Sequence, residues 1–188
     1  MDERRLSDDL RAFLRLLTER EVEFMLVGGY AVALHGFPRA TSDLDVWIST
    51  APETVDRIVA ALREFGFDPG ADAIAALTTK GKVLRMGYAP ARIELLTAPA
   101  GVEFHNCKLR AVTKEALGVP VPTILLDDLI RNKRATDEAE GVGPTKACAH
   151  ITLRGAAQRQ PAAAGVRAGF RTYWSNPQRE SRMPMAVH

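Results

Sequence analysis

Two aspartates interrupt an apolar segment early in the chain, and this arrangement restricts the fold more than any other feature of the sequence. The segment is LVGGYAVALHGFPRATSDLDVWIS, residues 26–49. Its last part alternates, which predicts a strand at 43–48 with Asp43, Asp45 and Trp47 on one face and Leu44, Val46 and Ile48 on the other. Two carboxylates on one partly buried face repel each other and need a compensating positive charge. We therefore expect a divalent metal ion beside Asp43 and Asp45.

Hydrophobic periodicity and turn residues predict the elements around this strand. Helices are expected at residues 7–17, 30–36 and 52–65, with a turn or two of helix at 71–78 and a further helix from residue 127. Strands are expected at residues 22–27, 82–88, 91–97 and 119–126. This order is typical of an α/β or α+β domain in which helices flank a mixed β-sheet.

The composition changes after about residue 136. Residues 137–188 are rich in Ala, Gly, Pro and Arg and show neither a helical nor a strand period. We therefore predict one folded domain at residues 1–136 and a basic, weakly ordered tail at residues 137–188. An out-of-frame extension would have the same composition, and the sequence leaves the two explanations open.

The charge is divided unequally between these two parts. Residues 141–188 contain Lys146 and six arginines against Glu180, a net charge of +6, which leaves 18 basic and 22 acidic residues, or −4, for residues 1–140. The overall charge of +2 is therefore no argument for nucleic-acid binding by the whole chain. Electrostatic contact of the tail with RNA is a weaker alternative.

The compartment follows from three negative signals. No run of about 18 apolar residues is present, so no membrane-spanning helix is predicted. The first residues, MDERRLSDDLRAFL, lack the apolar centre of a signal peptide. Cys107 and Cys148 do not form a disulfide framework, which favours a reducing cytoplasm.

The candidate site begins with Gly28 and Gly29, which lie between the strand at 22–27 and the following helix. Glycines at such a turn allow backbone N–H groups to approach an anion. Asp43 and Asp45 supply hard oxygen ligands, as Mg²⁺ bound to a nucleotide's phosphates requires. A structural turn and a solvated acidic face are the respective alternatives, although the apolar neighbours of the aspartates weaken the second.

Three further residues extend this site. Glu94 lies in the apolar strand RIELL and is a candidate third metal ligand or a base for an attacking hydroxyl. Arg39 and Thr41 lie in the loop before Asp43, where a cation and a hydroxyl suit phosphate oxygens. The structural alternatives are a surface ion pair between Glu94 and Arg92, and ordinary loop contacts for the other two.

The motif VGGYAVALHGFPRATSDLDVWI resembles the signature of the nucleotidyltransferase superfamily with the DNA polymerase β-like palm. It is most similar to small bacterial nucleotidyltransferases grouped with AbiEii-type toxins of toxin–antitoxin systems, and the match covers about residues 20–135. The resemblance implies that Gly28 and Gly29 hold the triphosphate, that Asp43 and Asp45 bind Mg²⁺, and that Glu94 is the third acid. Lys133 matches a helix lysine that faces the nucleotide in relatives, with a solvated lysine as the alternative.

Two departures from the family pattern bear on activity. The third acid is more usually Asp, and Glu94 is longer by one methylene group. In relatives the LIRNKRA helix is commonly followed by a Lys-Asp-rich helix that packs on the domain, and in this chain TDEAEGVGPTKACAH takes that place. These departures leave open a non-catalytic domain that binds a nucleotide or a partner protein.

The resemblance implies a Mg²⁺-dependent transfer of a nucleoside monophosphate from an NTP such as ATP to a hydroxyl-bearing acceptor. The acceptor classes are an RNA end such as that of a tRNA, a protein side chain or a small molecule. A cognate antitoxin is a further implied partner, and no membrane partner is expected. The chemistry needs positioning and electrostatic stabilisation rather than covalent catalysis.

Three other patterns are set aside. His105, Cys107, Cys148 and His150 form a Cys₂His₂ set, but their one-residue spacings differ from those of structural zinc sites. Residues 141–146, GVGPTK, lack the spacing and the preceding strand of a P-loop. His35 ends a short helix, where a structural role is more common than contact with a base.

Overall fold

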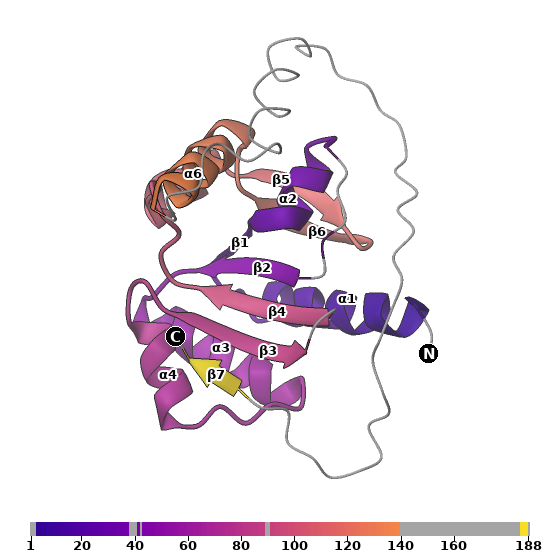
Figure 1. The fold of residues 1–188 in the computed structure, drawn as a ribbon. Coiled ribbons are helices and arrows are strands. Elements are labelled where there is room, and N and C mark those ends of the chain that lie inside the picture. The colour runs from indigo at the N-terminus through magenta and orange to yellow at the C-terminus, as the bar shows by residue number, and fades with distance from the viewer. Residues whose placement is uncertain (1–2, 38–40, 42, 89–90, 140–184, 188) are drawn as a thin grey trace.

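The computed structural model describes residues 3–37, 41, 43–88, 91–139 and 185–187 (Figure 1). The helices are α1 (Glu3–Glu19), α2 (Gly28–Leu34), α3 (Pro52–Glu64), α4 (Ala71–Thr78), α5 (Phe104–Arg110) and α6 (Leu126–Ala139). The strands are β1 (Phe24–Leu26), β2 (Asp43–Ile48), β3 (Val83–Tyr88), β4 (Ala91–Leu96), β5 (Val112–Ala116), β6 (Val119–Thr123) and β7 (Met185–Val187).

The described strands form one mixed sheet in the order β5-β6-β1-β2-β4-β3-β7. Strand β2 runs parallel to β4 and antiparallel to β1, while β3 runs antiparallel to β4. The parallel pairing of β2 and β4 requires a long crossover, which α3, α4 and β3 supply. The expected α/β fold with a mixed sheet and flanking helices is therefore confirmed.

Helices cover both faces of the sheet, and each face has its own core (Figure 1). On one face, side chains of α1, α3 and α4 pack on alternate strand residues that include Leu44, Val46 and Leu95. On the other face, α2, α5 and α6 surround a smaller core that contains Met25 and Trp47. Because side chains alternate along a strand, Asp43 and Asp45 project to the same side as Trp47. The predicted division of residues 43–48 between two faces is confirmed.

The predicted elements differ from the structure mainly in what they omit. Helix α5 and strands β5 and β7 have no counterpart among the predicted elements. Helix α6 continues to Ala139, three residues past the predicted domain boundary. Residues 140–184 and 188 of the predicted tail lie outside the described residues, whereas Met185–Val187 pair with β3. None of the described helices is both long and apolar enough to cross a membrane.

Candidate active site

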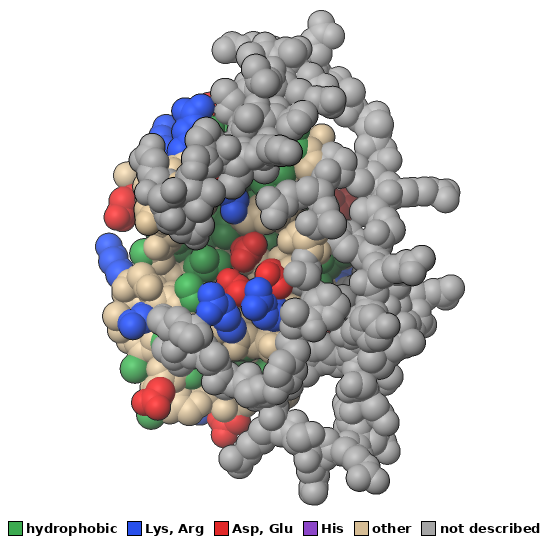
Figure 2. Space-filling view, in the orientation of Figure 1, with side chains coloured by type: hydrophobic (Ala, Val, Ile, Leu, Met, Phe, Trp, Pro, Cys, Tyr) green, Lys and Arg blue, Asp and Glu red, His purple; other side chains and the backbone are tan. Residues whose placement is uncertain are grey.

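Strand pairing brings the three predicted acids together on one face of the sheet. The parallel register of β2 and β4 sets Asp45 opposite Glu94 and Asp43 opposite Arg92. The antiparallel register of β3 and β4 then sets Arg85 opposite Glu94. Directly opposed residues have neighbouring side chains, so acids and arginines form a compact group across three strands. Figure 2 shows acidic side chains gathered near the centre of this face with basic side chains beside them.

Two arginines hold two of these carboxylates. Arg92 donates from Nε to Oδ1 of Asp43 at 3.1 Å and from Nη2 to Oδ2 at 2.7 Å, which is a bidentate pair. The same Nη2 atom lies 3.5 Å from Oε1 of Glu94. Arg85 donates from Nε to Oε1 of Glu94 at 2.9 Å. The alternative of a surface acid paired with Arg92 is met only in part, because Glu94 is buried and the main partner of Arg92 is Asp43.

Asp45 is the acid of this group whose charge is least compensated. Its pKa rises from 3.8 to about 6, because burial disfavours the charged form and the charge of Glu94 adds to that effect. An N–H donated by Gly29 at 3.3 Å and the charge of Lys133 act in the opposite direction, and Asp43 adds a further small rise. Burial, more than neighbouring charge, therefore makes the charged form of Asp45 unfavourable.

Gly28 and Gly29 begin α2, and Gly28 lies directly against Asp45 of β2. Gly28 has a φ of +63°, and a Cβ atom there would come within 1.8 Å of Oδ2 of Asp45. A Cβ atom on Gly29 would come within 2.3 Å of Oγ1 of Thr41. The glycine pair is thus required by the close approach of α2 to Asp45 and Thr41. Its predicted contact with a triphosphate stays a prediction.

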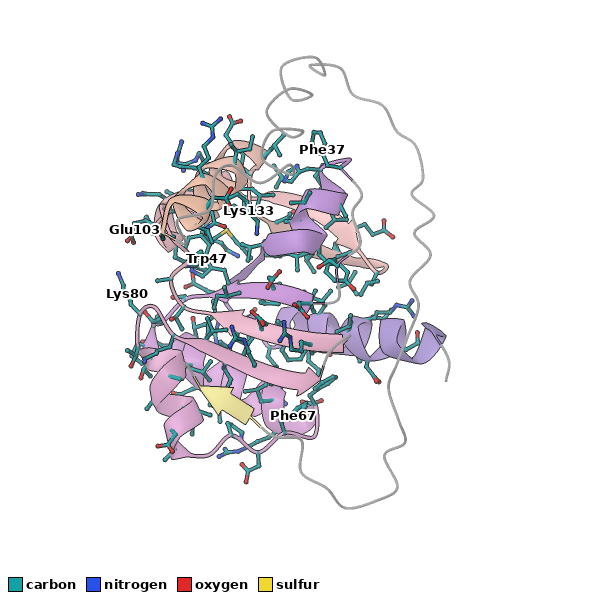
Figure 3. All side chains as sticks on the ribbon, viewed as in Figure 1. Phe37, Trp47, Phe67, Lys80, Glu103 and Lys133 are labelled. Carbon is teal, nitrogen blue, oxygen red and sulfur yellow. The ribbon has the colours of Figure 1, made fainter. Side chains whose placement is uncertain are left out.

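Helix α2, the segment before β2 and helix α6 contribute further groups. Burial raises the pKa of Tyr30 to about 12, with the charge of Asp43 adding to the rise, so its phenol stays protonated near that acid. Thr41 donates its hydroxyl to the backbone oxygen of Asp43 at 3.4 Å. Lys133 lies on α6 (Figure 3), close enough for its charge to lower the pKa of Asp45. Arg39 lies outside the described residues.

Comparisons with known proteins give the fold. No family model and no curated protein sequence matches the chain. A candidate nucleotidyltransferase from Thermotoga maritima has a similar structure, with a TM-score of 0.52, 16% identity, and coverage of 84% of this chain and 95% of that one. The solution structure of the antibiotic-resistance factor ANT(2'')-Ia is also similar, with a TM-score of 0.52, 15% identity, and coverage of 84% of this chain and 85% of that one. The chain has a nucleotidyltransferase fold.

This fold leads to the question of whether the acids suit a divalent metal. Asp43 and Asp45 offer the carboxylate oxygens that Mg²⁺ prefers, and the raised pKa of Asp45 marks a place where added positive charge is favourable. The described residues contain no group of three His, Cys, Asp or Glu side chains that could hold a metal ion, and arginines hold Asp43 and Glu94. The donor set therefore fits Mg²⁺ provided that Arg92 leaves Asp43.

The residues that were set aside take structural places in this nucleotidyltransferase fold where they are described. Cys107 is buried in α5 and lies against Asp128, whose carboxylate also accepts from Arg110. His35 lies 2.8 Å from the backbone oxygen of Ile124 through Nε2. Cys148, His150 and residues 141–146 lie outside the described residues. Nothing in the described part of the chain brings His105 and Cys107 into a metal site.

Sequence reasoning missed Arg85 as a member of the site. Its signal was the alternation of residues 82–88, in which Leu84 and Met86 are buried and Arg85 projects to the opposite face. That alternation predicts that the strand has a polar face, but it does not predict which residues of the adjacent strand lie beside that face. Only the register between β3 and β4 shows that this face meets Glu94.

Proposed function

We propose that the protein is a Mg²⁺-dependent nucleotidyltransferase that moves a nucleoside monophosphate from an NTP to a hydroxyl-bearing acceptor. The observation that supports this proposal most is the juxtaposition of Asp43, Asp45 and Glu94 beside the glycines that begin α2. The fold also supports the proposal, because it is similar to that of a solved structure described as a nucleotidyltransferase and to that of the antibiotic-resistance factor ANT(2'')-Ia. Fold alone does not determine function, so the proposal rests on the acids.

In this proposal Asp43 and Asp45 hold the metal, with Glu94 as a third acid close to Asp45. When bound, Mg²⁺ neutralises charge on the triphosphate and on the departing pyrophosphate. Lys133, Thr41 and the backbone at Gly28 and Gly29 face the phosphates, and Arg39 is a further candidate there. These groups act by orienting the substrate and by electrostatic complementarity.

The reaction forms a bond between the acceptor oxygen and the α-phosphorus, and breaks the bond between that phosphorus and the oxygen that bridges to the β-phosphate. Pyrophosphate leaves with the electron pair of the broken bond. The hydroxyl proton passes to Glu94 or to water, since Glu94 is the carboxylate beside Asp45. An RNA end, a protein side chain and a small molecule such as an antibiotic are the acceptor classes, and a cognate antitoxin is a proposed partner in the cytoplasm.

A second function is favoured by a specific observation. Arg92 and Arg85 already hold two of the acids, and the third acid is Glu rather than Asp. A palm domain in which those pairs persist would bind a nucleotide or a partner protein without turnover. Nucleotide binding without release of pyrophosphate would support this second function.

The test is incubation of the full chain with each of the four labelled NTPs, Mg²⁺ and cell extract, followed by a search for a labelled acceptor. We expect label on one acceptor class, released pyrophosphate, and loss of both with Asp45→Asn. The exposed pair of Arg63 and Asp68 provides a matched control, since Asp68→Asn removes a carboxylate that belongs to neither β2 nor β4. If none of the NTPs gives Mg²⁺-dependent transfer with any extract, or if Asp45→Asn transfers as much label as the wild type, the enzymatic proposal is refuted.

A further inference from the structure

The proposed function does not explain why Arg92 pairs with Asp43, because the proposed metal needs the same carboxylate. Arg92 contacts both side-chain oxygens of Asp43, at 3.1 and 2.7 Å. A divalent cation bound to those oxygens would meet the guanidinium at contact distance, where like charges repel strongly. Metal and Arg92 therefore compete for Asp43.

The two arginines of the site are not equivalent. Arg85 has Glu94 as its hydrogen-bonding partner, and the side chain of Glu94 is only 11% exposed. Arg92 holds Asp43, whose side chain is 23% exposed, so the two arginines differ in the burial of their partners and not in their own exposure, which is 35% for both. Glu94 therefore keeps a guanidinium at Oε1 when Arg92 moves. When Arg92 leaves, the carboxylate that loses this partner is the more exposed one, Asp43. An unpaired buried carboxylate would be costly, and Glu94 avoids that state because it keeps Arg85.

The displaced guanidinium has a chemically suitable new partner within the site. The planar fork that fits a carboxylate also fits a phosphate group, and both pairs are charge-assisted. A triphosphate that enters with the metal brings several negative charges to the position that Arg92 faces. A long side chain anchored in β4 next to Asp43 reaches that position by rotation about its own bonds.

We propose that Arg92 is an exchangeable cation that neutralises Asp43 in the ligand-free site and transfers to triphosphate oxygens when the metal–nucleotide binds. This inference rests on the proposed function, and it adds to that function a phosphate-binding residue and an order of events. Metal alone binds weakly, because Arg92 competes with it. Metal and nucleotide bind together tightly, because the nucleotide offers Arg92 a replacement for Asp43.

The inference makes opposite predictions for two ligands of one variant. In Arg92→Gln, Mn²⁺ alone should bind about five- to ten-fold more tightly than to the wild type, because the competitor is gone. The complex of Mn²⁺ with α,β-methylene-ATP should bind about ten-fold more weakly, because a phosphate contact is lost. Loss of free-Mn²⁺ signal in electron paramagnetic resonance measures the first, and calorimetry measures the second.

Two further variants keep the test independent of folding and of general electrostatics. Arg92→Lys keeps the charge but loses the fork, so Mn²⁺ affinity should lie between those of the wild type and Arg92→Gln. Arg85→Gln removes the same charge from the neighbouring strand, and it should raise Mn²⁺ affinity less, since its partner is Glu94. Thermal melts of all variants check that each one folds.

The outcomes separate the two proposals. Wild type that binds neither Mn²⁺ nor the nucleotide complex contradicts the proposed function and this inference together. A second outcome overturns only the exchange of Arg92 between Asp43 and phosphate. In it the wild type binds Mn²⁺ and the nucleotide complex and needs Asp45 for both, but Arg92→Gln changes the two affinities in the same direction or not at all. Equal gains in Mn²⁺ affinity for Arg85→Gln and Arg92→Gln also overturn it, because charge alone would then explain the effect.

Discussion

Replacing Asp45 with asparagine should stabilise the metal-free protein at neutral pH. The folded state raises the pKa of Asp45 from 3.8 to about 6, so between these values the folded protein binds a proton more readily than the unfolded chain does. Stability therefore falls as pH rises from about 4 to about 6. An asparagine carries no charge to bury, and its side-chain oxygen can still accept the N–H of Gly29.

The magnitude follows from the same values. The interval from 3.8 to about 6, at about 1.4 kcal/mol per pH unit, gives an upper limit of about 3 kcal/mol. We expect Asp45→Asn to gain about 1–3 kcal/mol at pH 7.5 and close to nothing at pH 4, where the wild-type carboxyl is already protonated when folded. Urea denaturation in EDTA, followed by tryptophan fluorescence, measures both values.

Asp43→Asn provides the matched control. Asp43 is held by the bidentate contact with Arg92, so the same change there should lose about 1 kcal/mol rather than gain it. Adding Mg²⁺ and ATP should raise the melting temperature of the wild type but not that of Asp45→Asn. If Asp45→Asn is destabilised equally at pH 4 and pH 7.5, the acid has a structural role and the reasoning from buried charge is refuted.

Three further predictions concern the site and its support. Gly28→Ala should lower the free energy of unfolding in urea by about 2–4 kcal/mol, because a Cβ there would overlap Asp45. Gly36→Ala is the control: a Cβ there would have no atom within 4 Å, so this variant should lose only the stability that the strain of its positive φ removes. Equal losses of stability in the two variants would contradict the packing argument. Asp128→Ala should lower the free energy of unfolding by about 2–3 kcal/mol, since this buried acid accepts hydrogen bonds from Arg110 and Arg131. Asp68→Ala, at an exposed ion pair, should change it by less than about 0.5 kcal/mol. A small loss for Asp128→Ala would show that stability does not depend on the contacts of Asp128 with these arginines. Transfer activity should stop in EDTA and return with Mg²⁺ or Mn²⁺; activity that persists in EDTA would exclude the proposed metal dependence.

The parts of the fold that sequence predicted are those with a strong local period. Residues 43–46 alternate between acidic and apolar side chains, and β2 spans Asp43–Ile48 as predicted. Residues 52–65 show a helical stripe that begins at a proline, and α3 spans Pro52–Glu64. In both cases burial of one face accounts for the pattern, so the pattern predicts the element.

The missed elements have weak or non-local signals. Helix α5 is seven residues long and buries only Cys107 among its described side chains, so it shows no periodic stripe. Strands β5 and β6 are joined at Leu117 and Gly118, both with positive φ, and leucine is not a residue that predicts such a turn. Strand β7 pairs with β3, about 100 residues earlier in the chain, and no local pattern encodes that contact.

The candidate site divides in the same way. Asp43, Asp45 and Glu94 were chosen by residue type and strand periodicity, and the register of β2 and β4 brings them together. Arg85, and the bidentate contact of Arg92 with Asp43, depend on which residues face each other across strands. Register is set by the whole sheet, so a single segment does not reveal these arginines.

The most direct measurement is a crystal structure of the full chain with Mn²⁺ and α,β-methylene-ATP, in which the anomalous signal locates the metal. We predict a metal peak about 2.1 Å from carboxylate oxygens of both Asp43 and Asp45, with the triphosphate bound to it and the guanidinium of Arg92 moved from Asp43 to phosphate. A nucleotide bound without a metal at these acids, or with Arg92 still paired to Asp43, would contradict this prediction.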